Sequence, residues 1–447
     1  MIKIFYIDKD KQLNEKEILA YINVFKTKYL PKLVTNKKYY DVKNPTISNR
    51  IMADETKSNV KIQTPWARMI VSLISNFFMG AGVKYSIPNE ELSALILANN
   101  NEELSHNQLL EKDCSIYGIA YELLYLNDNK QLKYTKLNPR TIIPIYSNDI
   151  DGELLYVIRF WEETDILTNN NIMNVELYSK NDIKIFKSIN GTLELLETKL
   201  HYFQSVNIVP YWNNEDLTGD TECVHKLIDG YDLSLSDTAN FRAELNDSYL
   251  VIYNSDLSDT DILKMKSNRI FSVDSTDTGS NAKIEWLTKD TNDTENENYK
   301  NRLAEDIAKF SYISDLETVS KSHISAESVK MGLMSISQLC SEKSTYFRKA
   351  LLKRLEMICN IYNLFGNNFD ITDVKIQFIP NIPQNISSVA NTINLLKDVI
   401  SRKSAISMLP FIDNVNEELA QIEEEKKHNY SNEKTETTEQ TETIIPE

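Results

Sequence analysis

The sequence predicts an α+β protein built from more than one packed unit. Stretches with apolar residues at every third or fourth position flank a run of short β-rich segments between residues 119 and 199. A third observation is a proline-free helical pattern over residues 325–366. The 447 residues are 41% apolar, which is enough for a core, but the chain exceeds the size at which one core keeps growing. We therefore expect several domains.

Amphipathic helices are predicted in the N-terminal part. A helix over residues 14–30 begins with Asn14 as N-cap, has Glu15 and Glu17 in its first turn, and ends before Pro31. After a polar segment, Pro65 opens a second helix that ends near Gly80, and a further helical stretch runs to about residue 117. The expected buried faces are Ile18, Ile22, Phe25 and Tyr29 in the first helix, and Met69, Ile70, Leu73, Ile74 and Phe77 in the second.

A mostly antiparallel sheet is predicted next. Asp151-Gly152 and Asn190-Gly191 are hairpin signals of the type I′ turn, in which both central residues need positive φ. The segment 147–152 has the glycine of a calcium-binding loop, but Ser147 stands where the first carboxylate belongs, so we interpret it as a turn. The expected strands are residues 119–126, 132–137, 154–161, 175–178 and 183–189.

Two helices are predicted to flank a small α/β insertion. Helical spacing covers residues 222–246, and Thr294 with Glu297 forms a capping-box pattern that opens a helix ending near Ile313. Within the insertion we expect a short helix that begins near Ser258 or Asp259. The expected strands of the insertion are residues 249–253, 270–273 and 283–287.

The helix predicted over residues 325–366 would span about 60 Å if straight, and Gly366 stands where a left-handed C-terminal residue is expected. Its apolar stripe fits a coiled-coil or bundle helix as well as a spine inside a large assembly, and the pattern alone does not separate these. A strand at 376–379 and helices at 387–400 and 414–425 follow. Residues 426–447 have almost no apolar content, which predicts a disordered tail.

The sequence contains no recognisable catalytic, metal or cofactor motif. Its ten glycines form no GxxxxGK, GxGxxG or GxSxG pattern. The five histidines form no HExxH, and the four cysteines form no CxxC, which favours reduced thiols over a disulfide framework or a zinc site. We therefore expect no enzymatic activity, no metal and no cofactor.

No membrane span or secretion signal is predicted. The longest apolar stretch, residues 69–83, is interrupted by polar residues and is shorter than the roughly 20 residues needed to cross a bilayer. The N-terminus has no basic flank followed by an apolar run and a cleavage site. We therefore expect synthesis in the cytoplasm.

Four strings occur in an order that resembles one known family. They are IVPYWNN at 208–214, LIDGYD at 227–232 followed by Ser236 and Asn240, YLVI at 249–252, and ISMLP at 406–410 followed by Asp413, Glu417 and Glu418. With the order of the predicted elements, they resemble the portal proteins, or head-to-tail connectors, of tailed bacteriophages with long non-contractile tails. The resemblance covers most of residues 62–425, and the order of the strings carries it.

The resemblance implies a ring of twelve copies at one capsid vertex, around an axial channel through which double-stranded DNA is packaged and ejected. It also implies a virion location and several partners: the large subunit of terminase, head-completion or connector proteins, and the major capsid or scaffolding protein. The implied domains are a wing (1–221 and 325–383), a stem (222–246 and 293–313), a clip (247–292), a channel loop (314–324) and a crown (384–425), followed by the tail (426–447).

Charge favours a passive channel over a protein that grips DNA. With a formal charge of −16 and a pI near 5.0, the chain lacks the basic excess that displaces phosphate counterions. By the resemblance, Glu244 and Glu305 would lie in the stem, where an acidic wall would repel phosphates. Lys321 and His323 of the loop are candidates for sparse phosphate contacts; the alternative is that both are merely solvated.

Two other classes of function remain open at this point. The first is a non-portal oligomeric scaffold or adaptor that uses the long helix as an interaction surface. The second is a metal-dependent hydrolase built from dispersed carboxylates.

Overall fold

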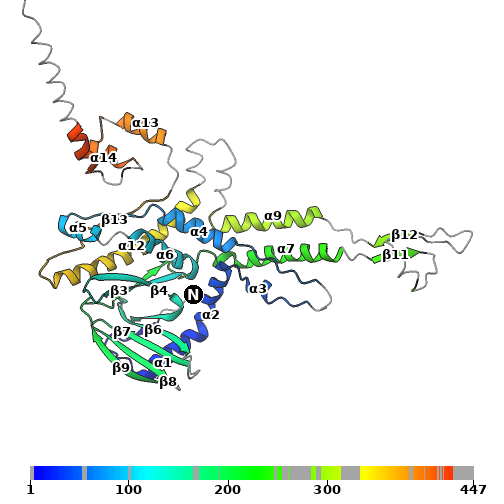
Figure 1. Cartoon of the computed structure of the whole chain (residues 1–447), viewed down its shortest axis with the longest axis horizontal. Coiled ribbons are helices and arrows are strands. Elements are labelled where there is room, and N and C mark those ends of the chain that lie inside the picture. Colours follow the sequence, from blue (N-terminus) through cyan, green and yellow to red (C-terminus); the bar gives the residue numbers. More distant parts are fainter. Residues whose placement is uncertain are drawn as a thin grey trace, which may run out of the picture. The chain divides into compact units, whose positions relative to one another are not determined.

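The structure, a computed structural model, is a mixed α and β protein, as predicted (Figure 1). It describes residues 5–52, 58–98, 102–164, 171–189, 191–245, 249–253, 260, 283–287, 293–313, 333–381, 386–396, 398–409, 412, 415 and 417–425. The chain divides into two compact units, Met1–Asn381 and Ile382–Glu447.

The first unit contains most of the described elements. Its α-helices are α1 (Glu15–Lys28), α2 (Leu30–Tyr40), α3 (Pro45–Ser48), α4 (Trp66–Met79), α5 (Glu90–Ala98), α6 (Glu103–Tyr117), α7 (His225–Leu245), α9 (Asp293–Phe310) and α12 (Met334–Asn363). Short 3₁₀ helices are η2 (Pro139–Thr141) and η3 (Glu222–Val224). Its strands are β1 (Phe5–Ile7), β2 (Val83–Ser86), β3 (Ile119–Leu126), β4 (Leu132–Leu137), β5 (Ile142–Ser147), β6 (Leu154–Thr164), β7 (Asn171–Tyr178), β8 (Asp182–Ile189), β9 (Thr192–Leu200), β10 (Ile208–Trp212), β11 (Tyr249–Tyr253), β12 (Lys283–Leu287) and β13 (Lys375–Phe378).

The largest sheet has six strands in the order β1-β5-β6-β7-β8-β9. Among the described strands of this sheet only the β1–β5 pair is parallel, so the prediction of a mostly antiparallel sheet is confirmed. Strands β5 and β9 were absent from the prediction. The first contains Pro144, which argues against a strand in isolation, and the second alternates charged and apolar residues with only Leu193 buried. A second sheet has the order β10-β3-β4.

The hairpin between β5 and β6 exists, but the predicted type I′ turn is wrong. Gly152 has φ of +57°, whereas Asp151 does not take a positive φ. The side chain of Asp149 holds a longer loop by accepting hydrogen bonds from the Gly152 N–H (3.1 Å) and from the Ser147 hydroxyl. A side-chain-supported turn therefore replaces the two-residue one, and the segment is a turn, as predicted. The second hairpin signal includes Asn190, which lies outside the described residues.

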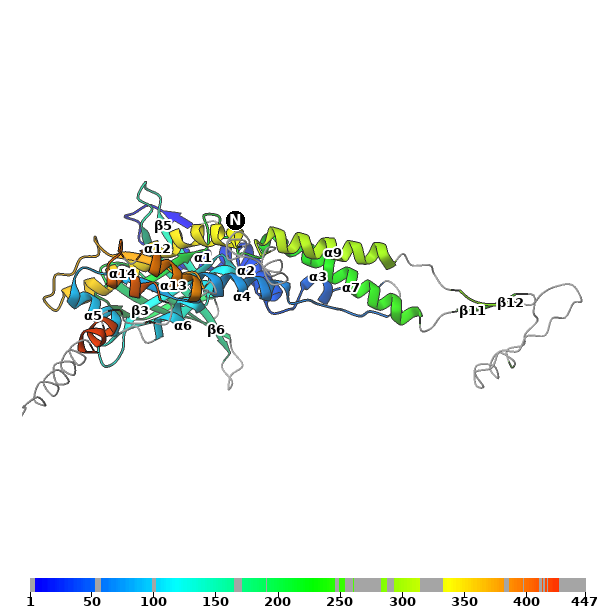
Figure 2. The same cartoon turned by 90° about the horizontal axis from the view of Figure 1, so that it is seen from above.

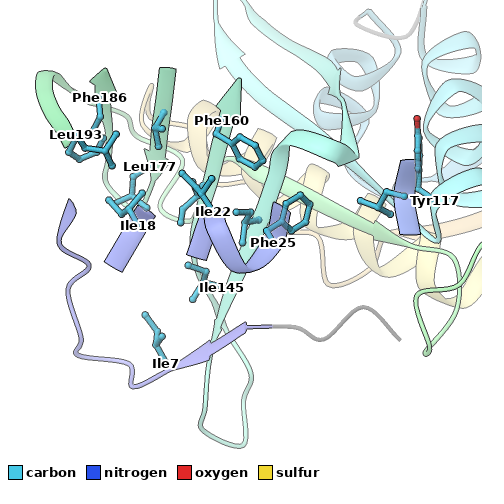
Figure 3. Packing of buried hydrophobic residues seen from close by; sticks show 14 of the residues in the cluster. Ile7, Ile18, Ile22, Phe25, Tyr117, Ile145, Phe160, Leu177, Phe186 and Leu193 are labelled. Atoms are coloured by element: carbon cyan, nitrogen blue, oxygen red, sulfur yellow. The ribbon is translucent and has the colours of Figure 1, made fainter. Parts of the chain in front are cut away.

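Helix α1 packs on the six-stranded sheet and forms the centre of the main core (Figure 3). Asn14 is its N-cap, as predicted. It accepts from the Glu17 N–H, and the Glu17 side chain accepts from the Asn14 N–H, which completes a capping box. Ile18 and Ile22 are fully buried, and Phe25 meets Phe160 edge to face with ring centroids 5.8 Å apart.

Two N-terminal predictions need correction. Pro31 does follow the end of α1, but the chain enters α2 at once, because a proline in the first turn removes no hydrogen bond that the helix needs. In α4, Ile70, Ile74 and Phe77 are buried as predicted, whereas Met69 and Leu73 are exposed. Helix α4 is apolar on most of its surface, so the spacing of its apolar residues does not show which of them are buried.

Helix α12 lies within the predicted 42-residue helix, whose residues 325–332 are outside the described part. Gly366 has φ of +96°, the left-handed conformation expected just beyond the helix. Lys343 on this helix is buried, with Nζ 2.6 Å from both Glu111 Oε1 and Asp220 Oδ2. It also donates to Ser115 Oγ at 2.9 Å, so the first buried cation of α12 has three partners from two other segments.

Arg354 is the second buried cation of α12. Its Nε donates to Glu122 Oε2 (2.9 Å), its Nη1 to Glu103 Oε1 (3.0 Å) and its Nη2 to Asn107 Oδ1 (2.7 Å). The hydroxyl of Tyr211 donates to the same Glu122 oxygen at 2.8 Å. Because removing one partner of a buried ion pair costs about 3–5 kcal/mol, these contacts fix the place of α12 on α6 and β3.

The regular elements described in the second unit are helices. Helix α13 covers Ile386–Leu396 and ends before the predicted limit at residue 400, and α14 (Arg402–Ser407) was not predicted. Residues 417–425 are helical, within the predicted helix 414–425. The tail, 426–447, lies outside the described residues, as do the strand predicted at 270–273 and the helix predicted near Ser258 or Asp259.

The pKa of Glu111 predicts a pH dependence of stability. Burial raises this pKa to about 7 against the opposing effect of Lys343, from an ordinary value of 4.5. Between these values the folded state holds a proton that the unfolded state releases, so stability falls as pH rises. Relative to Glu111→Gln, the wild-type chain should lose stability between about pH 5 and 8 in urea titrations followed by tryptophan fluorescence.

Glu342→Gln, which changes an exposed carboxylate on α12, is the matched control, and its difference from wild type should stay nearly constant with pH. A difference between wild type and Glu111→Gln that grows in favour of wild type over the same range would contradict the prediction.

Candidate functional site

Helices α7 and α9 lie side by side as a pair that carries β11 and β12 at one end (Figures 1 and 2). They are antiparallel, since the Sγ of Cys223, just before α7, lies 3.6 Å from the carbonyl oxygen of Phe310 at the end of α9. Strands β11 and β12 pair antiparallel from Tyr249↔Leu287 to Tyr253↔Lys283. The two predicted helices and these two predicted strands are therefore present.

Apolar packing joins the two helices along part of their predicted faces. Leu303 and Ile307 of α9 are buried, whereas Tyr299 and Phe310 of the same predicted stripe are about half exposed. At Gly230 of α7 a Cβ atom would meet the Leu303 methyl groups at 3.7 and 3.8 Å, an ordinary van der Waals distance. The helices thus approach closely without requiring glycine.

Helix α7 also makes polar contacts with segment 60–64. We call the three hydrogen bonds between them, given below, the ladder. Backbone N–H groups of alternate residues in the extended segment 60–64 donate to side chains at every fourth position of α7. Two residues of extended chain advance about 6.6 Å and four residues of helix about 6 Å, so the two spacings match. The three pairs are Val60 to Asn240 Oδ1 (2.6 Å), Ile62 to Ser236 Oγ (3.0 Å) and Thr64 to Asp232 Oδ1 (3.0 Å).

Further polar contacts hold the first turns of α7. The Tyr39 hydroxyl donates to Asp229 Oδ1 (2.7 Å), and the Asn44 amide donates to Asp232 Oδ2 (2.9 Å). The Tyr39 ring stacks on His225 with centroids 3.8 Å apart and planes 11° apart. Burial lowers the pKa of His225 to about 4, so this ring stays neutral at physiological pH.

The residues predicted to face DNA are only partly described. Glu305 lies on α9 and is exposed, and Glu244 lies in the last turn of α7, although its side chain is outside the described part. Because the helices are antiparallel, these two positions lie toward opposite ends of the pair. Lys321 and His323 are outside the described residues.

Helix α9 carries mixed charge with an acidic excess. Lys300 pairs with Glu297 (2.5 Å) and Arg302 with Asp306 (2.9 Å), so part of the acidic charge is neutralised on the helix itself. Its acidic residues are Asp293, Glu295, Glu297, Glu305 and Asp306, against Lys300, Arg302 and Lys309.

The ladder side chains were part of the strings quoted from the sequence, but their partner was not predicted. The available signal was a polar stripe, Asp229, Asp232, Ser236 and Asn240, at helical spacing on a helix that also carries an apolar face. Such a stripe indicates a polar partner, but the segment that supplies it lies about 170 residues earlier in the chain.

The chain matches the family model described as "Phage portal protein, SPP1 Gp6-like" over residues 20–431. It belongs to this portal protein family. Members are structural components of the virion, and the resemblance seen in the sequence is confirmed. The antiparallel pair α7 and α9, with its strands and its ladder, is therefore part of a portal protein.

Two curated portal proteins show how distant the relatives are. The chain is 21% identical to the portal protein of Bacillus phage SPP1 over 234 residues, which is 49% of this chain and 45% of that protein. It is 25% identical to the portal protein of Clostridium phage phiCD119 over 243 residues, 48% of this chain and 53% of that protein. The chain thus spans about half the length of these relatives.

A crystal structure of a HK97-family phage portal protein from Corynebacterium diphtheriae is also similar. It has a TM-score of 0.36 and 11% identity, covering 75% of this chain and 95% of the other. Membership of the family depends on the family match and not on this similarity.

Among the residues that the structure describes, no helix combines the length and the apolar character that crossing a bilayer requires. Within the same part of the chain, no three or more histidine, cysteine, aspartate or glutamate side chains are grouped so as to hold a metal ion.

The ladder predicts protease resistance at Lys61. Asp232→Ala removes the acceptor of the Thr64 N–H and leaves the Asn44 amide unpaired, which should cost about 2–3 kcal/mol of local stability. Trypsin should then cleave after Lys61 at least several-fold faster than in wild type, as measured by mass spectrometry of the N-terminal fragments.

Asp237→Ala is the matched control, because Asp237 lies on the same helix but is half exposed and binds Arg50 outside the ladder. Equal cleavage rates after Lys61 in Asp232→Ala and wild type would show that the ladder does not hold segment 60–64.

Proposed function

We propose that identical copies of this chain form a ring at one vertex of a phage capsid, and that double-stranded DNA passes through the ring during packaging and ejection. The match to the portal family over residues 20–431 supports this function most strongly, because it extends over nearly the whole chain. A ring of twelve copies is part of the proposal.

In this proposal α7 and α9 form the stem that surrounds the DNA. A channel wall has to keep its shape while a stiff, charged polymer moves past it. The ladder and the Leu303–Ile307 packing support α7 and α9 from their own chain, so the stem does not depend on DNA for its order. The proposed regions are the wing (1–221 and 325–383), clip (247–292), channel loop (314–324) and crown (384–425).

The charge of the chain supports passage in preference to tight binding. Its net formal charge is −16, and the exposed Glu305 lies on α9. An acidic wall repels phosphates and keeps a translocating duplex from being trapped. Lys321 and His323 of the proposed channel loop would then supply sparse attractive contacts that steady the DNA.

Energy for packaging would come from a separate terminase, with its large subunit docked at the clip. We also propose head-completion or connector proteins and the major capsid or scaffolding protein as partners in the virion. The chain itself would act without catalysis or a cofactor.

The alternative function, an oligomeric scaffold joined through the long helix, is less well supported. Such a helix needs an apolar face free for a partner. In α12 the apolar stripe is buried in the same chain, including Phe347, Leu351, Leu355 and Ile358. The described part of the helix therefore serves the core of the first unit.

Negative-stain microscopy of the purified protein tests the ring. We expect axial views with a central hole and twelve-fold symmetry, and mass photometry should give a single large oligomer. A protein that stays monomeric or dimeric at all concentrations and salt conditions would contradict the proposal.

Neutralising the stem tests the acidic wall. Glu305→Gln and Glu244→Gln should together slow DNA ejection or shorten the packaged DNA, because less repulsion leaves more friction on the duplex. Packaged length and ejection rate are the measurements, and Glu91→Gln on α5 is the control for an exposed acid outside the stem. Unchanged length and rate in the double variant would refute the acidic-wall hypothesis but leave the ring intact.

A further inference from the structure

The loop between β5 and β6, residues 147–153, ends in a fully exposed apolar residue, and we call this loop the tip. Ile150 is more exposed than any other large apolar side chain that the structure describes. Hydrogen bonds within the tip hold its shape, because Ser147 Oγ accepts from the Glu153 N–H (2.9 Å) and Asp149 accepts from the Gly152 N–H. A preformed loop loses little conformational entropy when it binds, so the tip is suited to docking.

Acidic side chains surround Ile150. Lys9 lies 3.1 Å from Glu153 and 4.0 Å from Asp149, so it offsets part of their charge. Asp8 adds another carboxylate, which accepts from the Asn148 amide of the tip. Within the described residues Asp151 has no ion-pair partner. The carboxylates of the tip and its neighbour are those of Asp8, Asp149, Asp151 and Glu153, against the single cation of Lys9.

The nearest groove leaves the tip acidic. Asp151 and Glu153 line a groove that also contains Lys349 and Lys353 of α12. Lys353 is paired with Glu356 on its own helix (2.8 Å), and in the described part of the chain Lys349 forms no ion pair with either tip residue. Even with Lys349 counted, the carboxylates outnumber the cations. The tip therefore presents an apolar side chain with an excess of negative charge.

Three cations gather around the ring of Tyr40, where α2, α4 and α6 pack together, and we call this surface the basic patch. Lys37 Nζ, Lys112 Nζ and Arg68 Cζ lie 4.7, 5.0 and 5.6 Å from the ring centroid. Lys37 pairs with Asp41 (2.7 Å), whereas among the described residues neither Arg68 nor Lys112 has an ion-pair partner. Cations around one ring repel one another, so a carboxylate brought to the patch is stabilised.

The patch stays basic when its neighbours are counted. Lys136 pairs with Asp113 at 2.7 Å, and the lysines of the patch also lie close enough to oppose the rise that burial causes in the pKa of Asp113. Arg140 lies near Tyr117, and its charge opposes the rise of that pKa in the same way. The cations of this region are Lys37, Arg68, Lys112, Lys136 and Arg140, whereas its described carboxylates are those of Asp41 and Asp113.

Exposed apolar side chains border the basic patch. Met69 follows Arg68 on α4 and is 40% exposed, and Leu73, one turn later, is 38% exposed. Leu109 of α6 lies three residues before Lys112 and is 47% exposed. The sequence predicted that Met69 and Leu73 would be buried, yet the described part of their own chain leaves them open. An apolar side chain from a second copy would cover them.

We propose that the tip of one copy docks on the basic patch of the next copy, with Asp151 facing Arg68. Ile150 then lies against Met69 and Leu73. In Figure 2 the β5–β6 hairpin projects at the top of the first unit, whereas α4 and α6 lie below it. Two different surfaces that face different ways form a head-to-tail contact, which closes a ring when its rotation permits. This inference rests on the proposed ring and assigns one of its interfaces.

Disulfide crosslinking tests the contact. In a Cys223→Ser background, which removes the exposed native cysteine, we combine Ile150→Cys with Met69→Cys. Mild oxidation should give a series of covalent multimers on a non-reducing gel, because each copy links to two neighbours. Each single variant should stay monomeric. The matched control, Ile150→Cys with Leu196→Cys, uses an exposed leucine of β9 at the far edge of the six-stranded sheet and should give no multimers.

The outcomes separate this interface from the proposed function. Rings in the microscope with no multimers above the control would overturn the interface and leave the proposed function standing. Covalent dimers from Ile150→Cys alone would also overturn it, since they indicate a symmetric contact. A wild-type protein that forms no rings would instead overturn the proposed function.

Charge reversal gives an independent measurement that needs no cysteine. Asp151→Lys and Arg68→Glu should each lower the fraction of protein in rings several-fold at low salt, and the two together should restore it. Both positions are exposed, so neither change disturbs a core. Glu91→Lys on α5 is the control and should leave the fraction unchanged. Failure of the double variant to recover would contradict the proposed pairing.

Discussion

The buried cations of α12 constrain the whole first unit. Lys343 and Arg354 lie about three turns apart on one helix, and each is enclosed by carboxylates from elsewhere in the fold. Two carboxylates raise the pKa of Lys343 above its usual value, although burial alone would lower it. An apolar stripe can slide by a turn and still be buried, but these two charges have partners in only one position of the helix. The place of the long helix on α6, β3 and the segment after β10 follows from them.

Polar contacts also fix the position of α7, through the ladder. Its buried side chains are hydrogen-bond acceptors, and each has a specific backbone N–H as its partner. Shifting segment 60–64 by one residue would turn its N–H groups away from the acceptors on α7, because the N–H groups of successive residues in an extended chain point to opposite sides. Polar groups thus determine where α7 and α12 pack, and apolar contacts stabilise both helices in those positions.

The sequence patterns correctly predicted the features that depend on residues close together in the chain. The Asn14 N-cap and the buried Ile18 and Ile22 follow from neighbours in sequence, and they were predicted. Strand β5 was not, because Pro144 cannot donate a backbone hydrogen bond and so argues against a strand, although β5 pairs with β1 and β6. In the candidate site, helical spacing placed Glu244 and Glu305 on the correct helices. The ladder depends on two segments far apart in the chain, which no local period reports.

The sequence distance across the ladder has a consequence for how the protein is made. Thr64 and Asp232 are separated by 168 positions, and a ribosome adds about 5–20 residues per second. Segment 60–64 therefore leaves the ribosome about 8–34 s before α7 does, and its ladder partners are absent in that interval. Closing a loop of 168 positions is slow, so the ladder forms late in folding. A growing chain lacks the complete ladder until α7 has emerged from the ribosome, so assembly that depends on the ladder begins only after that point.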